Sequence, residues 1–170
     1  MACRRWDVAP TRFLLVVSIA QQSMSLWRRG RPGSTYAMQR RYVVSTSRFG
    51  IGSQRNTNCT PLGLHRVARK VGGGWPQGAV WKSRRRVGWT WQGRPEAPIA
   101  HRILWLDGLE PGLNRGGNVD TFARYIYVHG IGNEMTLGRP ASHGCIHLSA
   151  TDILPLYDLL PVGTLIWIEV

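Results

Sequence analysis

The sequence predicts a mainly β domain with one short helix near its C-terminus. Short apolar runs, several of them β-branched, recur between segments rich in Gly, Pro, Ser and Asn. A convincing helical spacing of apolar residues occurs only close to the end. The chain has 170 residues, of which 43% are hydrophobic and 18% are charged. That composition suits one domain with a buried core and excludes a highly charged disordered chain.

The first two strands are predicted at residues 13–20 and 23–28. The first run follows Arg4 and Arg5, so it superficially resembles the charged and apolar regions of an export signal. It is short and β-branched, however, and two glutamines follow it, so a strand is the better interpretation. It is also shorter than the roughly 20 apolar residues that cross a membrane, so stable membrane insertion is not expected.

Further strands are predicted where apolar runs meet turn-forming residues. They cover residues 42–46, 64–71, 99–106, 125–129 and 164–170. A turn is expected at 29–33 and a loop at 50–63. Residues 72–98 are rich in Gly, Trp and Arg without a clean period, and we expect a long irregular loop there. Residues 1–12 are expected to form a loose basic tail, which leaves 13–170 as the folded domain.

The helix is predicted to start after Ser149, whose side chain is of a type that caps helix N-termini. Apolar side chains then fall at i, i+3, i+4 and i+7 and form one buried stripe: Ile153, Leu156, Tyr157 and Leu160. Pro155 removes a hydrogen bond to the Thr151 carbonyl, so the helix is expected to be short or bent. Pro161 and Gly163 end it.

Basic residues dominate the first part of the chain. There are 22 Lys and Arg against 9 Asp and Glu, and residues 1–102 contain 19 of the basic and 2 of the acidic side chains. Arg binds carboxylates and phosphates, so a nucleic acid, an anionic lipid or a cell-wall polymer is one interpretation. A solvated basic surface is an equally good one. The run Arg84-Arg85-Arg86 is short and accompanies no known nucleic-acid signature, so nucleic acid is not an expected partner.

The chemically informative segment lies between Tyr127 and His147, where three of the five His residues occur together with Cys145. A thiol becomes reactive when a base or a cation stabilises its thiolate. His129 or His143 could supply that base, and we expect one of them to hold the sulfur as an anion at the mouth of a cleft. Gly144 allows a tight turn whose amides could bind an oxyanion.

Two other interpretations of these residues remain open on spacing alone. His129, His143, Cys145 and His147 could be metal ligands, although their spacing fits no standard zinc pattern. They could also be structural, because Cys is often a small buried hydrophobe. The three cysteines, Cys3, Cys59 and Cys145, cannot all pair in disulfides within the chain, so one thiol stays free.

The pairing of His129-Gly130 with Ser142-His143-Gly144-Cys145-Ile146 resembles the signature of the L,D-transpeptidase catalytic domain family (YkuD type). Two further segments are similar to the family's strand and Thr-Pro-x-Gly turn, namely 42–47 and Thr60-Pro61-Leu62-Gly63. Residues 152–164 resemble its helix and Gly-Thr turn after the cysteine.

The resemblance implies a β-sandwich-like fold and bacterial cell-wall chemistry without a metal or cofactor. Family members attack the bond between an L-centre and a D-amino acid in a peptidoglycan stem peptide and form a thioester. An amine acceptor then gives a cross-link, and water gives carboxypeptidase activity. A non-catalytic protein that binds peptidoglycan or another anionic polymer is the remaining alternative. The expected location is the bacterial cell envelope or periplasm, although no clear export signal is visible.

By position, the resemblance makes Cys145 the nucleophile and His129 its base, with the Gly130 carbonyl orienting the imidazole in place of a carboxylate. His143 and Gly144, with the Cys145 amide, would shape the oxyanion and substrate pocket.

The resemblance also implies supporting roles for residues around the signature. Ser142 would support the loop. Arg139 is equally compatible with contacting a substrate carboxylate and with bracing that loop. His147 is a departure, because the family usually has Arg or Asn there. A histidine carries charge only near or below its pKa, so we expect weaker activity or a sharper pH dependence than with Arg.

Overall fold

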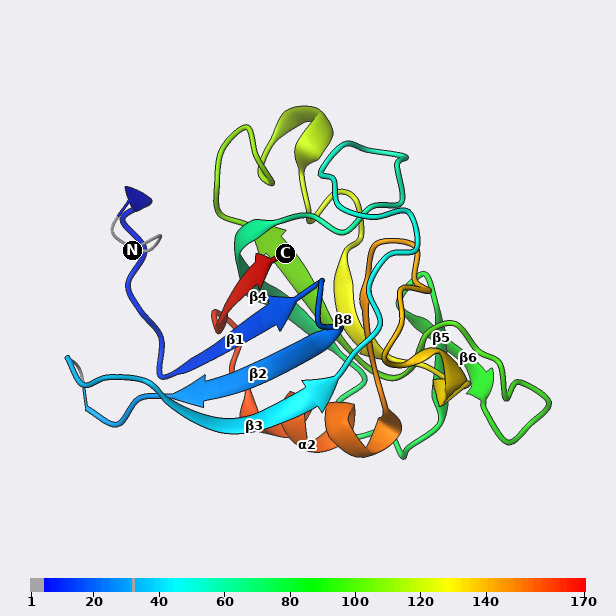
Figure 1. Cartoon of the computed structure of the whole chain (residues 1–170). Helices are drawn as coiled ribbons and strands as arrows, with labels where there is room; N and C mark the ends of the chain where they lie inside the picture. The colour runs from blue at the N-terminus through cyan, green and yellow to red at the C-terminus, as the bar shows by residue number, and fades with distance from the viewer. Residues whose placement is uncertain (1–4, 32) are drawn as a thin grey trace.

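The structure is a computed structural model that describes residues 5–31 and 33–170 (Figure 1). In this part of the chain the strands are β1 (Phe13–Ser18), β2 (Ser23–Arg28), β3 (Ala37–Val43), β4 (Gly63–Val71), β5 (Ala79–Lys82), β6 (Arg85–Trp89), β7 (Ala100–Gly108), β8 (Tyr127–Gly130), β9 (Ile146–Leu148) and β10 (Leu165–Glu169). The helical elements are α2 (Ala150–Leu159) and two single 3₁₀ turns, η1 (Gly117–Val119) and η2 (Glu134–Thr136). The mainly β class with a C-terminal helix is therefore confirmed.

Hydrogen bonds connect the described strands into one mixed sheet. Its main path runs β3-β2-β1-β10-β4-β7-β5-β6, and β8 adds to β7 and then carries β9. Two neighbouring pairs are parallel, β1–β10 and β8–β9. The main hydrophobic core takes side chains from β1–β3 and β10 and also from β7 and β8, which lie farther along the sheet, including Leu15, Leu104, Val128 and Ile166. The sheet therefore curls around a shared core instead of lying flat.

Helix α2 covers the lower edge of that core in Figure 1 and packs against β7 and β8. Ser149 caps it as expected, since its Oγ accepts a hydrogen bond from the Asp152 amide at 3.1 Å. The predicted apolar stripe is buried, with Ile153 and Leu160 fully enclosed. The helix continues past Pro155 to Leu159 and is short, at ten residues.

The prediction for residues 42–46 was shifted. Strand β3 starts earlier, at Ala37, because residues 37–43 pair with β2. Residues 44–46 leave that edge and turn into the core, and Ser45 forms an isolated bridge to His147. This segment therefore connects the sheet edge to the cysteine loop. The strand predicted at 125–129 also starts later than expected, at Tyr127.

The prediction of an irregular loop over residues 72–98 was wrong in part, because β5 and β6 form a hairpin within it. The two residues between the strands, Ser83 and Arg84, have φ of 49° and 64°. These are the positive angles of a type I′ hairpin turn, which usually contains Asn or Gly. The sequence therefore lacks the usual signal for this turn.

Part of the predicted basic tail contacts the folded domain. Residues 1–4, including Cys3, lie outside the described residues. The Trp6 Nε1 donates a hydrogen bond to Glu110 Oε2 at 2.9 Å. Within the described ranges, no helix combines the length and apolar character that crossing a membrane requires.

Candidate active site

The parallel pair β8–β9 brings the signature residues together. Its register sets His129 opposite His147 and Val128 opposite Ile146. Cys145 directly precedes β9, which places it level with Tyr127. Because side chains alternate between the faces of a strand, Tyr127, His129, Cys145 and His147 share one face. The two halves of the motif therefore meet on adjacent strands.

The imidazole of His129 is buried and held in one orientation. Its Nδ1 lies 2.8 Å from the Gly130 carbonyl oxygen, which can only accept, so Nδ1 carries the proton and Nε2 is an acceptor. Burial lowers the pKa of His129 to about 4, although the bond to Gly130 acts in the opposite direction. A Cβ at Gly130 would lie 2.7 Å from the His101 ring on β7, so the close approach of β8 to β7 requires glycine at this position.

The Cys145 side chain is half-buried. The Sγ donates a hydrogen bond to the Tyr125 carbonyl at 3.6 Å. Burial raises the pKa of the thiol to about 11, opposed by the Tyr127 backbone and by the Arg124 guanidinium. The sulfur is therefore a neutral thiol at neutral pH. No hydrogen bond joins it to His129 or His143, which differs from the imidazole-held anion expected from sequence.

The loop before Cys145 is fixed by hydroxyl groups. Ser142 Oγ donates to the Cys145 carbonyl at 2.6 Å and accepts from the Gly144 amide at 3.2 Å. Gly144 has φ of +113°, and a Cβ there would lie 3.1 Å from the Cys59 carbonyl oxygen. Thr60 Oγ1 donates to the Gly144 carbonyl at 3.1 Å. The first residue of the Thr-Pro-x-Gly turn therefore stabilises the cysteine loop through this hydrogen bond.

His147 lies against His129, with ring centroids 4.8 Å apart. Burial, together with the neighbouring His129 and His143, lowers the pKa of His147 to about 3. The ring is thus neutral at physiological pH. Its buried Nδ1 has no hydrogen-bond partner within the described chain.

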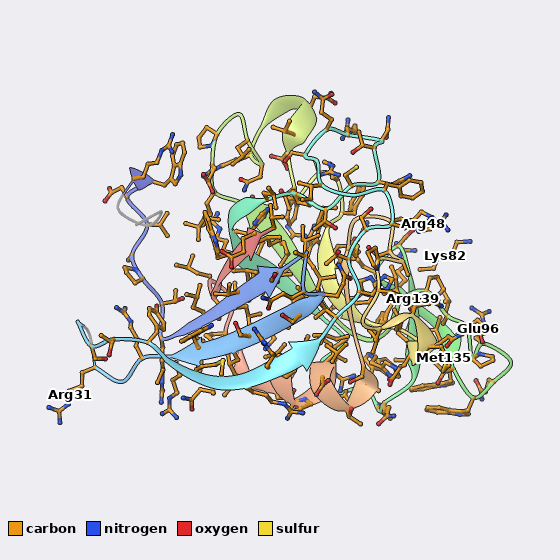
Figure 2. All side chains as sticks on the ribbon, viewed as in Figure 1. Arg31, Arg48, Lys82, Glu96, Met135 and Arg139 are labelled. Carbon is orange, nitrogen blue, oxygen red and sulfur yellow. The ribbon has the colours of Figure 1, made fainter. Side chains whose placement is uncertain are left out.

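His143 and Arg139 lie farther out. The exposed His143 ring accepts a hydrogen bond from Arg48 Nη2 at 2.9 Å through its Nε2. Arg139 is exposed, and its backbone carbonyl accepts a hydrogen bond from Ser45 Oγ at 2.7 Å. Arg48 and Arg139 lie on the same side of the molecule in Figure 2.

Arg124 was not identified from the sequence, although it neighbours the thiol. It is half-buried, and its Nη2 donates to the Cys59 carbonyl at 2.7 Å. Burial lowers the pKa of Arg124, opposed by the thiols of Cys59 and Cys145. The available signal was its rarity, because residues 103–170 contain only 3 basic residues.

The metal-site interpretation receives no support from this geometry. Across residues 5–31 and 33–170, no group of three or more His, Cys, Asp or Glu side chains has an arrangement suited to a metal ion. His143 points to Arg48, and the Cys145 sulfur points to a backbone carbonyl.

The fold places the chain in the class of L,D-transpeptidase structures. An L,D-transpeptidase from Mycobacterium smegmatis has a TM-score of 0.53 at 21% identity, covering 94% of this chain and 59% of that one. One from Mycobacterium tuberculosis has a TM-score of 0.55 at 19% identity, covering 94% and 58%. Bd1075 from Bdellovibrio bacteriovorus has a TM-score of 0.58 at 17% identity, covering 94% and 48%. The chain therefore spans about half to three fifths of the length of these proteins.

Sequence comparison assigns the family. The profile of the YkuD L,D-transpeptidase catalytic domain matches residues 12–168, and the chain belongs to this family. No curated protein sequence matches it. The family acts on peptidoglycan and is associated with the bacterial cell envelope.

Proposed function

We propose that this chain is a cysteine-dependent L,D-transpeptidase acting on peptidoglycan stem peptides in the cell envelope. The observation that carries the proposal is the His129 imidazole, which is fixed by the Gly130 carbonyl on the strand adjacent to Cys145. That bond leaves Nε2 as the proton acceptor on the face that Cys145 shares. The family assignment supplies the reaction class.

The reaction starts from a neutral pair, because burial favours the uncharged thiol and the uncharged imidazole. Cys145 leaves the Tyr125 carbonyl by rotation about χ1 and turns toward His129. As the sulfur attacks the peptide carbonyl, its proton passes to His129 Nε2, and a tetrahedral oxyanion forms. The Gly144 amide is occupied by Ser142 Oγ, so the Cys145 amide is the donor for this oxyanion.

Collapse of the tetrahedral species breaks the peptide bond. The protonated His129 gives its proton to the departing amine of the D-amino acid, and the stem remains on Cys145 as a thioester. A side-chain amine of a second stem then attacks, loses its proton to His129, and releases the cross-linked peptide with the free thiol. Water in the same position gives an L,D-carboxypeptidase product.

Intact mass spectrometry with a purified tetrapeptide stem tests the proposal. We expect a mass increase equal to the tetrapeptide minus the free D-amino acid that leaves, located on Cys145 by peptide mapping. Adding an amine acceptor gives a cross-linked product, whereas hydrolysis gives only a tripeptide. The Cys59→Ala variant should form the same adduct, because it keeps Cys145. Saturable peptide binding without an adduct would instead support a non-catalytic peptidoglycan-binding protein.

A further inference from the structure

A polar pocket of about 190 Å³ lies next to the candidate nucleophile. Its lining includes Arg55, Asn56, Asn58, Arg124, Tyr125 and His143. Tyr125 connects the pocket with the thiol, because its carbonyl accepts the hydrogen bond from Cys145 Sγ. We call this hollow the arginine pocket. Tyr125 therefore borders both the pocket and the sulfur.

The arginine pocket is positively charged without an acidic counterpart. Its lining contains two guanidinium groups and no carboxylate. Arg124 donates to backbone carbonyls of Cys59 and Gly52, so no ion pair neutralises it. Arg48 adds a third guanidinium behind His143. Uncompensated and partly desolvated positive charge favours an anionic ligand.

Asp120, the acidic residue nearest to Arg124 in the sequence, does not neutralise the guanidinium groups of the pocket. Asp120 accepts hydrogen bonds from the amides of Gly116 and Ala123, both at 2.8 Å. Its carboxylate therefore stabilises its own loop.

The loop that contains Asn56 and Asn58 lines the pocket together with Arg124, and its conformation is fixed before a ligand binds. Asn56 and Asn58 have φ of 67° and 57°, a left-handed conformation that Asn tolerates better than most residues. The Arg55 amide donates to the Asn118 carbonyl at 2.8 Å, which ties this loop to the segment before Arg124. A pocket formed before binding loses less entropy when a ligand enters.

We propose that the arginine pocket binds a carboxylate of the acyl-donor peptide, with Arg124 as the principal contact and Arg55 at the rim. The proposal rests on the proposed function, because it takes the stem peptide as the ligand. Two carboxylates qualify, the terminal one and an internal one. Both present the same two oxygens to a guanidinium. Their shared chemistry makes Arg124 a specificity-determining residue that favours stems with free carboxylates over amidated stems.

Binding to the Cys145→Ala protein tests the proposal without turnover. Isothermal titration calorimetry compares three peptides: the stem tetrapeptide, its terminal amide and its internal amide. We expect one amide to bind about tenfold more weakly or worse, since hydrogen bonds to charged groups are among the stronger ones. The amide that loses affinity identifies which carboxylate enters the pocket.

Variants in the Cys145→Ala background assign the effect to the pocket. Arg124→Gln should bind the acid and the amide equally, and Arg124→Lys should keep only part of the preference. Arg31→Gln is the matched control and should keep the full preference, because Figure 2 shows Arg31 on the opposite side of the molecule from Arg48, the partner of His143. If Arg124→Gln does not fold, Arg55→Gln provides the second test and should reduce the preference.

The outcomes separate this proposal from the proposed function. Equal binding of all three peptides, or a preference that survives in a folded Arg124→Gln variant, overturns the carboxylate site. Acylation of unmodified Cys145 by the same peptides is measured in parallel by intact mass. Acylation without a carboxylate preference contradicts the pocket alone. A carboxylate preference that depends on Arg124, without acylation, contradicts the proposed reaction alone.

Discussion

Two parallel strand pairs in the described sheet use the same backbone arrangement for different purposes. In β1–β10, Leu15 lies opposite Ile166, and both are fully buried in the main core. In β8–β9, His129 lies opposite His147, and Cys145, the residue before β9, shares their face. Parallel pairing aligns side chains in both places. The residue types on the shared face therefore decide whether such a pair builds the apolar core or brings titratable side chains together.

The largest expected effect is the loss of acylation when the thiol beside the β8–β9 pair is removed. Cys145→Ala should lower acyl-enzyme formation by a factor on the order of 10³ or more, because no other group replaces the nucleophile. Its urea unfolding midpoint should change little, since the hydrogen bond of the thiol to the Tyr125 carbonyl is long. Intact mass and urea titration measure both quantities. An adduct of the same mass in this variant would show that another residue is acylated.

The opposite result is expected in the aliphatic pair. Ile166→Ala should lower the free energy of unfolding by about 2–5 kcal/mol, the usual cost of truncating a buried aliphatic side chain. The folded fraction should still acylate Cys145, since Ile166 does not touch the site. Urea titration and the mass assay on the same sample decide the point. A loss of acylation at full folding would show that the two pairs are coupled.

Acid should destabilise the protein through its buried histidines. His65 and His129 have folded pKa values of about 4, against 6.5 for the free side chain. The unfolded state therefore binds more protons between pH 6.5 and 4, so stability is full above pH 6.5 and falls as the pH drops toward 4. As the pH falls to 4, each histidine lowers the free energy of unfolding by on the order of 3 kcal/mol. Urea titrations at pH 7.5 and 4 measure the change, and His129→Gln should show a smaller fall.

The protonation state of the sulfur predicts how alkylation depends on pH. With a thiol pKa of about 11, iodoacetamide should label Cys145 about tenfold faster for each pH unit between 6 and 9, because only the thiolate reacts. Quantitative peptide mapping follows Cys145 separately from Cys59. A rate that levels off near pH 7 would instead reveal a thiolate paired with an imidazolium.

The smallest expected effect concerns His147. A neutral ring cannot supply the permanent charge that Arg brings, so His147→Arg should raise the rate of acylation by severalfold near pH 7. The pKa of about 3 means that His147 itself adds little pH dependence above pH 5. Acylation rates of both proteins between pH 5 and 9 test this. Identical profiles would reject a role for charge at this position.

Local patterns predicted much of the fold because periodicity and burial agree there. Strand β2 coincides with the predicted 23–28, and α2 follows the cap at Ser149. The β5–β6 hairpin could not be predicted, because Ser and Arg, at positions 83 and 84, are not residue types typical of a turn with positive φ. Strand β9 has only three residues, too few to show a period.

The candidate site was predictable only as far as its motif. The sequence indicates Cys145 and His129, and parallel pairing brings their strands together. It does not indicate that the sulfur turns to the Tyr125 carbonyl, because that contact depends on a loop in which Tyr125 itself has φ of 59°. The scarcity of basic residues in 103–170 narrows the choice to three, but it does not single out Arg124, since burial beside the thiol is a property of the folded chain.

The parallel pairing of β8 and β9 also accounts for the interval between the two halves of the motif. Antiparallel neighbours can be linked by two residues, whereas parallel neighbours need a crossover of about a dozen or more. Here residues 131–145 form the crossover connection between Gly130, at the end of β8, and Ile146, at the start of β9. The interval is therefore close to the length that a parallel connection requires. Insertions can lengthen it, but a deletion that shortens it well below this span would separate the imidazole from the sulfur while leaving every motif residue intact.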